Sequence, residues 1–261
     1  MPGRIGARKA GAVGWLEFDN PDRFNAIDLA MWKGMGEAMA AFDADPEVRV
    51  IAVTGAGTKA FTTGADISEF EAMRGSEAQR DAYNATADAG RRVLITTAKP
   101  TVAVIRGYCM GGGVALALDC DFRIAAADAR FGVTIAKLGA AYRVEDLRHL
   151  IDAVGQAAAR EILMTAATFT GEEAKGLGLV TRVAAPEALD EVAGAFIDRL
   201  AGNAPLSMAA TKRTIAELLK LPGEQDLAAA EAAIERCLTS ADATEGRDAF
   251  MQKRKPVFGG V

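Results

Sequence analysis

"CMGGGVALALDCD", residues 109–121, decides the fold prediction, because three consecutive glycines open a segment that is expected to be helical. The first amides of a helix have no partner within the helix and carry a partial positive charge, so they can bind a negatively charged oxygen. The residues that follow the glycines, 114–118, are all apolar. The stretch therefore offers backbone donors for an oxyanion, but no acid or base in the first turns of its helix.

A second loop of the same kind lies upstream. "FTTGADISEF", residues 61–70, is expected to follow a buried strand and to lead into a helix that starts near Asp66. Two loops that each pass from a strand into a helix could aim their amides at one point. Such a pair of donors suits the oxygen of a thioester as it becomes an enolate or a tetrahedral oxyanion.

A third glycine-containing stretch resembles a nucleotide-binding pattern only superficially. "VTGAGTKAF", residues 53–61, matches Gly-x-Gly-x-x-Ala after a predicted strand. That pattern needs a helix to begin at the second glycine, whereas Thr62, Thr63 and Gly64 follow at once and break any helix. We therefore interpret the stretch as a plain connecting loop.

Around these loops, strands and helices alternate in the first half of the chain. Alternating or continuously apolar runs predict strands, and apolar residues on one stripe predict helices. From about Val144 onwards the chain is predicted to be mostly helical. This order predicts an α/β core with a C-terminal helical layer. The predicted strands are 12–18, 48–55 and 100–107, with short extended pieces at 121–126 and 130–133, and the predicted helices are 28–42 behind the N-cap Asp28, 77–97, and four segments within 187–254.

Composition limits the classes of function. The net charge of −5 over 261 residues argues against a nucleic-acid partner. The sequence contains no run of about 18 apolar residues, the length needed to span a membrane. The N-terminus is basic but lacks the apolar segment of a secretory signal. Three scattered cysteines indicate a reducing compartment, and a single histidine, His149, excludes metal sites and triads that need two. We therefore expect a cytoplasmic protein without a bound metal.

Several motifs occur in a fixed order between residues 12 and 258. They are NPDRFNAID (20–28), TGAGTKAFTTGADISEF (54–70), KPTVAVIRGYCMGGGVALALDCDFRIAAADARFG (99–132), EILMTAATFTGEEAKGLGLVTRV (161–183) and AFMQKRKPVF (249–258). As an ordered set they resemble the enoyl-CoA hydratase/isomerase (crotonase) superfamily. The resemblance implies an α/β fold with a ClpP/crotonase-type β-β-α spiral core over residues 1–200. It also implies a helical trimerisation region over 201–261, in a homo-oligomer that is a trimer or a dimer of trimers.

The resemblance also assigns residues to an acyl-CoA site, in which coenzyme A is part of the substrate and no separate cofactor is needed. The two oxyanion amides would belong to Ala65 and Gly112. Ala65, Asp66 and Ile67 would lie along the coenzyme. Arg23 and Lys253 match positions where members place cations near its phosphates, Lys253 acting from a neighbouring subunit; otherwise both are ordinary surface charges.

The proton carriers of the superfamily are missing. Its hydratases use one glutamate two residues after the glycine triplet and a second glutamate twenty residues later, and its double-bond isomerases keep the second. One carboxylate takes a proton from water while the other protonates the α-carbon. This chain has Ala115 and Ile135 at those positions, and neither side chain can move a proton.

The following loop, "GAAYRVEDLRHL" (139–150), supplies polar groups where family hydratases have a PGAGG loop. Tyr142 falls where relatives similar to methylmalonyl-CoA decarboxylase carry a tyrosine, although those relatives also have a histidine at the position of Ala65. Glu145 and Asp146 lie within three residues of the position from which some dehalogenating and isomerising members extend an aspartate. We therefore predict Tyr142 and Glu145 as the proton carriers.

Structural roles compete for the same acidic residues. Glu145 and Asp146 would also suit the first turn of a helix that starts near Val144, with Arg143 and Arg148 neutralising them. Asp119, one turn beyond Ala115, is either a relocated carboxylate or a structural hydrogen-bond acceptor. His149 has no obvious partner and is predicted to lie at the surface or an interface.

Three functions remain open from the sequence. The first is a lyase or isomerase of the enoyl-CoA hydratase/isomerase type with displaced catalytic groups. The second is a decarboxylase of a malonyl-type CoA thioester, which needs an enolate stabiliser but no base. The third is a catalytically silent acyl-CoA-binding protein. An apolar acyl pocket would be lined by Phe70, Met73, Met110, Ile135 and Leu138.

Overall fold

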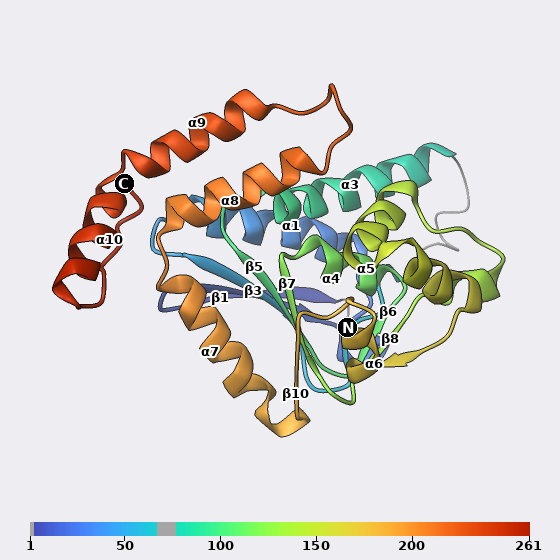
Figure 1. The fold of residues 1–261 in the computed structure, drawn as a ribbon. Coiled ribbons are helices and arrows are strands. Elements are labelled where there is room, and N and C mark those ends of the chain that lie inside the picture. The colour runs from blue at the N-terminus through green and yellow to red at the C-terminus, as the bar shows by residue number, and fades with distance from the viewer. Residues whose placement is uncertain (1–2, 67–76) are drawn as a thin grey trace.

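The computed structural model describes residues 3–66 and 77–261. Three consecutive units of strand, strand and helix build its core (Figure 1). In each unit the first strand joins one sheet and the second strand joins the other, so the chain advances as the predicted β-β-α spiral. The units are β3 (Val50–Gly55), β4 (Ala60–Thr62) and α3 (Glu77–Thr96); β5 (Thr101–Ile105), β6 (Tyr108–Met110) and α4 (Gly112–Asp119); and β7 (Phe122–Ala126), β8 (Arg130–Gly132) and α5 (Val144–Thr165).

The larger sheet has six strands in the order β1-β2-β3-β5-β7-β10, with β10 spanning Arg182–Ala184. β1 (Arg4–Ala10) and β2 (Val13–Asp19) are antiparallel, whereas the other neighbours are parallel. The parallel strands β3 and β5 are almost entirely buried, as expected for strands covered on both faces.

The smaller sheet, β4-β6-β8-β9, places the candidate site. β4, β6 and β8 are parallel neighbours, and β9 (Phe169–Thr170) closes the sheet antiparallel to β8. Thr62 at the end of β4 pairs with Cys109 of β6. Because parallel strands end at the same edge, the two glycine-containing loops leave this sheet side by side.

The helix α1 (Leu29–Ala44) confirms two predictions. The side chain of Asp28 accepts a hydrogen bond from the Met31 amide at 2.8 Å and so caps the helix. Met31, Met35 and Met39 are fully buried, so the methionine stripe packs in the core.

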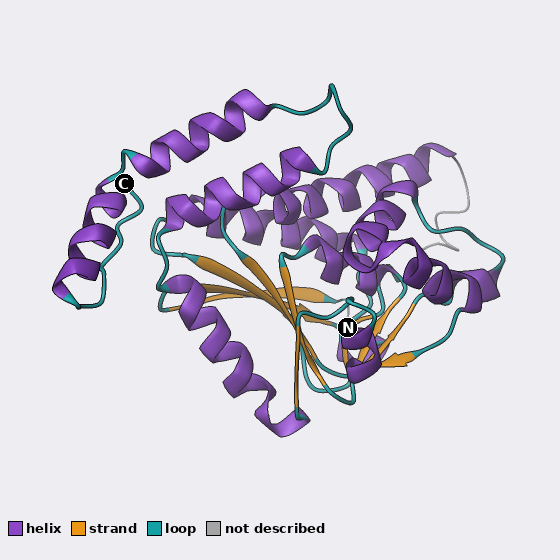
Figure 2. Ribbon diagram, in the orientation of Figure 1, coloured by secondary structure: helices purple, strands orange, loops and turns teal. Residues whose placement is uncertain are grey.

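The remaining helices cover the sheets and extend to one side of the molecule (Figure 2). They are α6 (Gly171–Gly176), α7 (Leu189–Ala201), α8 (Pro205–Leu218), α9 (Leu227–Leu238) and α10 (Ala241–Gln252), with short 3-10 turns at η1 (Pro21–Arg23), η2 (Ile135–Leu138) and η3 (Pro186–Ala188). In Figure 1, α10 lies at the opposite end of the molecule from α5. The division into core and C-terminal region at residue 200 falls at the end of α7, and it stays a prediction.

Several local predictions need correction. β1 was missed because its sequence, RIGARKA, is polar and the strand is largely exposed at the sheet edge. α9 begins at Leu227, because Asp226 caps it by accepting a hydrogen bond from the Ala229 amide. α5 is kinked at Gly155, whose backbone is not helical. The prediction of a helix that starts near Asp66 falls on residues outside the described part of the chain.

Candidate active site

The two glycine-containing loops touch through their backbones. A methyl group on Gly64 would lie 2.7 Å from the Gly112 Cα and 2.8 Å from the Gly112 nitrogen. A Cβ on Gly113 would lie 2.1 Å from the carbonyl oxygen of Thr62. Only glycine leaves room for this approach, and Gly64 also adopts a φ of +86° that favours glycine. The glycines therefore hold the two loops in direct contact.

The amides of Ala65 and Gly112 lie at this contact. The Ile27 amide donates to the Gly64 oxygen and the Asp66 amide donates to the Ile27 oxygen, so the intervening amide of Ala65 faces away from Ile27. Gly112 begins α4, where the first amides have no partner within the helix. Within the described residues, neither amide donates to a protein acceptor, so both are available to a ligand.

Buried polar side chains fix the first loop. The Thr62 hydroxyl donates to the Asn25 carbonyl oxygen at 2.6 Å and accepts from the Gly64 amide at 3.0 Å. The side-chain nitrogen of Asn25 donates to the Ala60 carbonyl oxygen at 2.7 Å, and the side-chain oxygen of Asn25 accepts from the backbone amide of Asn20 at 3.0 Å. The NPDRFNAID motif thus holds the strand and loop that precede Ala65 through hydrogen bonds of Asn25. The motif was identified in the sequence, but its asparagines were given no role.

The positions of the missing glutamates are apolar in the structure as well. Ala115 is buried in α4, and Ile135, the first residue of η2, is half-buried against the core. Met110 is also half-buried, whereas the side chain of Leu138 is 69% exposed. Two further residues predicted to line the site, Phe70 and Met73, lie outside the described residues.

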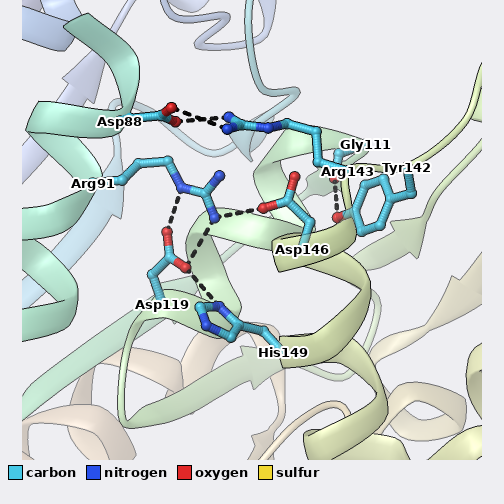
Figure 3. A network of polar contacts seen from close by, with 8 residues as sticks. All are labelled: Asp88, Arg91, Gly111, Asp119, Tyr142, Arg143, Asp146 and His149. Atoms are coloured by element: carbon cyan, nitrogen blue, oxygen red, sulfur yellow. Dashed lines mark hydrogen bonds and ion pairs between the residues drawn. The ribbon is translucent and has the colours of Figure 1, made fainter. Parts of the chain in front are cut away.

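The two predicted proton carriers lie beside the start of α5. The Tyr142 hydroxyl donates to the carbonyl oxygen of Gly111, the residue that precedes α4, at 3.2 Å (Figure 3). Burial raises the pKa of Tyr142 well above its ordinary value, so the hydroxyl stays protonated at neutral pH. Glu145 is exposed in the first turn of α5, and no hydrogen bond or ion pair involves its carboxylate within the described residues.

Two of the predicted coenzyme-binding residues contact each other. Arg23 and Asp66 form an ion pair at 2.6 Å, with the arginine side chain half exposed and the aspartate nearly buried. Lys253 follows α10 in a left-handed conformation, and α10 lies at the opposite end of the molecule from α5 (Figure 1). Ile67 lies outside the described residues. All five coenzyme-binding assignments, including that of Ala65, stay predictions.

A buried ionic cluster between α3, α4 and α5 was not predicted. Arg91 of α3 bonds both oxygens of Asp119 and contacts Asp146 at 2.7 Å (Figure 3). His149 was predicted to lack a partner, but its Nδ1 lies 3.2 Å from Asp119. No local pattern indicates that Arg91, 28 positions before Asp119, faces that carboxylate.

The arginines of the loop also differ from the prediction that they neutralise Glu145 and Asp146. Arg143 forms a two-pronged pair with Asp88 of α3, and Arg148 donates to the Leu219 carbonyl oxygen. Asp146 instead contacts Arg91 from a different helix. Sequence neighbours on a helix point in different directions, and this loop lies between several elements.

Comparison with known proteins identifies the family. The model of the enoyl-CoA hydratase/isomerase family matches residues 8–261 of this chain. The chain belongs to the enoyl-CoA hydratase/isomerase family. This confirms the resemblance that the ordered motifs predicted. Within the described residues, no three histidine, cysteine or acidic side chains gather as a metal site, and no helix is long and apolar enough to cross a bilayer.

Family members similar to this chain are named for different activities. An (E)-benzylidenesuccinyl-CoA hydratase of Thauera aromatica is 33% identical over 95% of this chain and 96% of its own length. A carnitinyl-CoA dehydratase of Salmonella typhi is 34% identical, with 96% of each chain covered. The crystal structure of an enoyl-CoA hydratase/carnithine racemase from Magnetospirillum magneticum superposes with a TM-score of 0.93 at 36% identity, covering 98% of this chain and 96% of that one. The fold is therefore shared across members with different substrates.

Proposed function

We propose that this protein binds an acyl-CoA thioester and catalyses a lyase or isomerase reaction of the enoyl-CoA hydratase type with displaced proton carriers. The observation that carries the proposal is the contact between the two loops, where two ligand-accessible amides, Ala65 and Gly112, lie together. Donors fixed in advance stabilise negative charge more than donors that must reorient. Membership of the family and the hydratases and dehydratases among the relatives support the same reaction class.

In this proposal the thioester oxygen accepts hydrogen bonds from both amides and carries the negative charge of the enolate. For hydration, Glu145 takes a proton from water as the oxygen of that water bonds to the β-carbon. The Tyr142 hydroxyl gives its proton to the α-carbon, and the proton on Glu145 returns to Tyr142 through solvent. The raised pKa of Tyr142 supports a donor role and not that of a base.

A second candidate is decarboxylation of a malonyl-type CoA thioester. It is favoured by the apolar side chains of Ala115 and Ile135. A substrate carboxylate in an apolar environment is poorly solvated and loses carbon dioxide more readily. The electron pair would pass to the enolate at the amides, and Tyr142 would then protonate the α-carbon. No base is required in this reaction.

The first prediction concerns crotonyl-CoA. We expect slow or absent hydration of crotonyl-CoA, because the two glutamates of the family hydratases are replaced by groups that cannot transfer protons, and longer enoyl-CoAs are assayed alongside it. Loss of one such group typically costs a factor of about 10²–10⁴ in rate. The assay follows loss of the conjugated thioester absorbance, alongside double-bond isomerisation and carbon dioxide release from methylmalonyl-CoA and ethylmalonyl-CoA.

The outcomes separate the candidates. Fast hydration that survives both Tyr142→Phe and Glu145→Gln would show that the chemistry lies elsewhere. Carbon dioxide release without hydration would select the decarboxylase. Calorimetric binding of acyl-CoAs with no turnover in any assay would select a silent binding protein, and no binding at all would refute the acyl-CoA site.

We also propose that the C-terminal helices assemble this chain into a trimer or a dimer of trimers, with Lys253 reaching the coenzyme of a neighbouring subunit. Large exposed apolar side chains support the proposal, since extended apolar surfaces usually mark contacts. These side chains lie along α8, α9 and α10 and in the adjoining segments. They are Ile215, Leu218, Leu219, Leu221, Leu227, Ile234, Leu238, Phe250, Met251 and Val257.

The second prediction tests this assembly. The double variant Leu238→Ser/Phe250→Ser is expected to weaken association at least about tenfold, because burying one large apolar side chain contributes about 1.5–3 kcal/mol. Light scattering after size exclusion should show a trimer or larger for the parent and a concentration-dependent shift towards monomer for the variant. Met164→Ser is the control, since Met164 is exposed on α5, outside this region. A parent protein that is monomeric at all concentrations would contradict the proposal.

A further inference from the structure

One guanidinium joins three helices beside the candidate site. Arg91 lies in α3 and its side chain is 9% exposed. Its Nε and Nη2 donate to the two carboxylate oxygens of Asp119 at 2.7 and 3.0 Å. The same Nη2 lies 2.7 Å from Oδ1 of Asp146 (Figure 3). Asp119 is the last residue of α4 and Asp146 lies in the first turn of α5, so Arg91 sets the end of one helix against the start of the next.

These two helices carry the groups assigned to the reaction. α4 begins with Gly112, and α5 follows directly after Tyr142 and includes Glu145. At the other end of α4, the Tyr142 hydroxyl bonds the Gly111 carbonyl oxygen. The α4 helix is thus fastened to the α5 segment at both ends, by Tyr142 at its start and through Arg91 at its end.

The charges of the cluster involve His149 as well. Arg91 contributes one positive charge and the two aspartates contribute two negative charges, so the three side chains alone carry an excess negative charge. An uncompensated charge in a buried site is costly. His149, 27% exposed and 3.2 Å from Asp119, restores neutrality when it is protonated.

We propose that Arg91 is a positioning residue of the acyl-CoA site, and that a protonated His149 is needed for Arg91 to hold Asp119 and Asp146 in the observed arrangement. The positioning role rests on the proposed function, in which the cluster holds Tyr142 in place relative to the oxyanion amides. The geometry of the cluster itself does not depend on that function.

The proposal has a defined pH dependence. The hydrogen bond to Asp119 raises the pKa of His149, while burial and Arg91 oppose the rise and Glu145, one turn earlier on α5, adds to it. Because the folded pKa lies above the unfolded value of about 6.5, the stabilisation is complete below about pH 6.5. It is lost as the pH rises through the raised value. The site should therefore loosen at alkaline pH.

The variants separate positioning from folding. Arg91→Lys keeps the positive charge, but one ammonium group cannot reproduce the forked contact with Asp119 while also reaching Asp146. Asp146→Asn removes the contact between Arg91 and α5 and leaves the Arg91–Asp119 pair in place. It is therefore expected to fold even if Arg91→Lys does not. The control is Asp88→Asn, which breaks the more exposed pair between α3 and Arg143. Thermal unfolding checks that each variant is folded.

The test compares calorimetric affinities for acetyl-CoA and for free CoA, which lacks the thioester carbonyl. Arg91→Lys and Asp146→Asn are expected to lower acetyl-CoA affinity about five- to tenfold, the value of one net hydrogen bond. Free CoA affinity should change less than about twofold, and Asp88→Asn should change both less than about twofold, as for exposed ion pairs. Equal losses for both ligands, or no loss in the folded variants, would overturn the positioning role.

The imidazole of His149 gives a readout that needs no activity. It is the only histidine in the chain, so NMR of the untagged protein reports one titration. We expect a midpoint above about 6.5, lowered by Asp119→Asn, and a thioester preference that falls over the same pH range. His149→Gln should show, at every pH, the weaker preference for the thioester that the parent shows once its histidine is deprotonated. If the parent binds no thioester, the proposed function fails while the titration still tests the cluster; an unshifted midpoint would refute the cluster itself.

Discussion

Replacing Gly64 by alanine is expected to lower turnover of the acyl-CoA substrate by about 10²–10³-fold, the range observed when one oxyanion donor is lost. The new methyl group would lie 2.7 Å from the Gly112 Cα and 2.8 Å from the Gly112 nitrogen. Both neighbours are backbone atoms, so no side chain can rotate to make room. The two loops must separate, and the Ala65 and Gly112 amides then no longer share one ligand oxygen.

The effect of the backbone conformation must be separated from the effect of the contact. Gly64 has a φ of +86°, so alanine is strained there whatever its surroundings, by about 1–2 kcal/mol. Gly57 offers a matched control, because its φ is +72° and a Cβ there would have nothing within 4 Å. Gly57→Ala should therefore lose a similar amount of stability in chemical denaturation while keeping turnover within about twofold.

The two substitutions give a clear contrast. If Gly64→Ala keeps the turnover of Gly57→Ala, then the contact between the loops does not position the oxyanion donors, and the proposed function loses its main support. The same contrast can be measured without turnover, by calorimetric binding of acetyl-CoA and free CoA. Gly64→Ala should then reduce the preference for acetyl-CoA over free CoA, whereas Gly57→Ala should not.

The sequence predicted the parts of this site that depend on short-range pattern. The glycine triplet at 111–113 follows a strand and opens α4, as its residues indicated. Backbone amides at a helix start are placed by the fold itself, so glycine-rich loops could be interpreted without knowing their neighbours. The strand-strand-helix order followed from the ordered motifs and their family resemblance.

The parts that sequence could not supply depend on contacts between distant segments. Arg91 and Asp119 meet because α3 and α4 pack together, and nothing in the pattern of residues 77–97 distinguishes Arg91 from Arg92. In the structure Arg91 is buried and Arg92 is exposed. The same reason explains the error over His149, whose partner Asp119 comes from another helix. Pairing of charges across helices is fixed by packing, which local periodicity does not describe.

Tyr142→Phe is expected to reduce turnover by about 10²–10⁴-fold, the usual contribution of one positioned proton-transfer group. The phenylalanine ring can occupy the same half-buried space, so only the hydroxyl is lost. Stability should fall by about 1 kcal/mol, the net value of the hydrogen bond to the Gly111 carbonyl oxygen. Tyr108→Phe is the control, because Tyr108 is a partly exposed tyrosine that packs edge-to-face on Phe24. It should leave turnover within about twofold.

The pH profile of Tyr142→Phe is expected to keep the shape of the parent profile. Burial raises the pKa of Tyr142 above its usual range, so the hydroxyl is protonated throughout an assay between about pH 5.5 and 9. Its removal should therefore lower kcat by the same factor at every pH and leave the limbs of the profile in place. Glu145→Gln should lower hydration as well, because an amide cannot accept the proton from water. If Tyr142→Phe lowers kcat only as much as Tyr108→Phe does, the α-carbon receives its proton from another group, and Tyr142 serves only to fasten α5 to the start of α4.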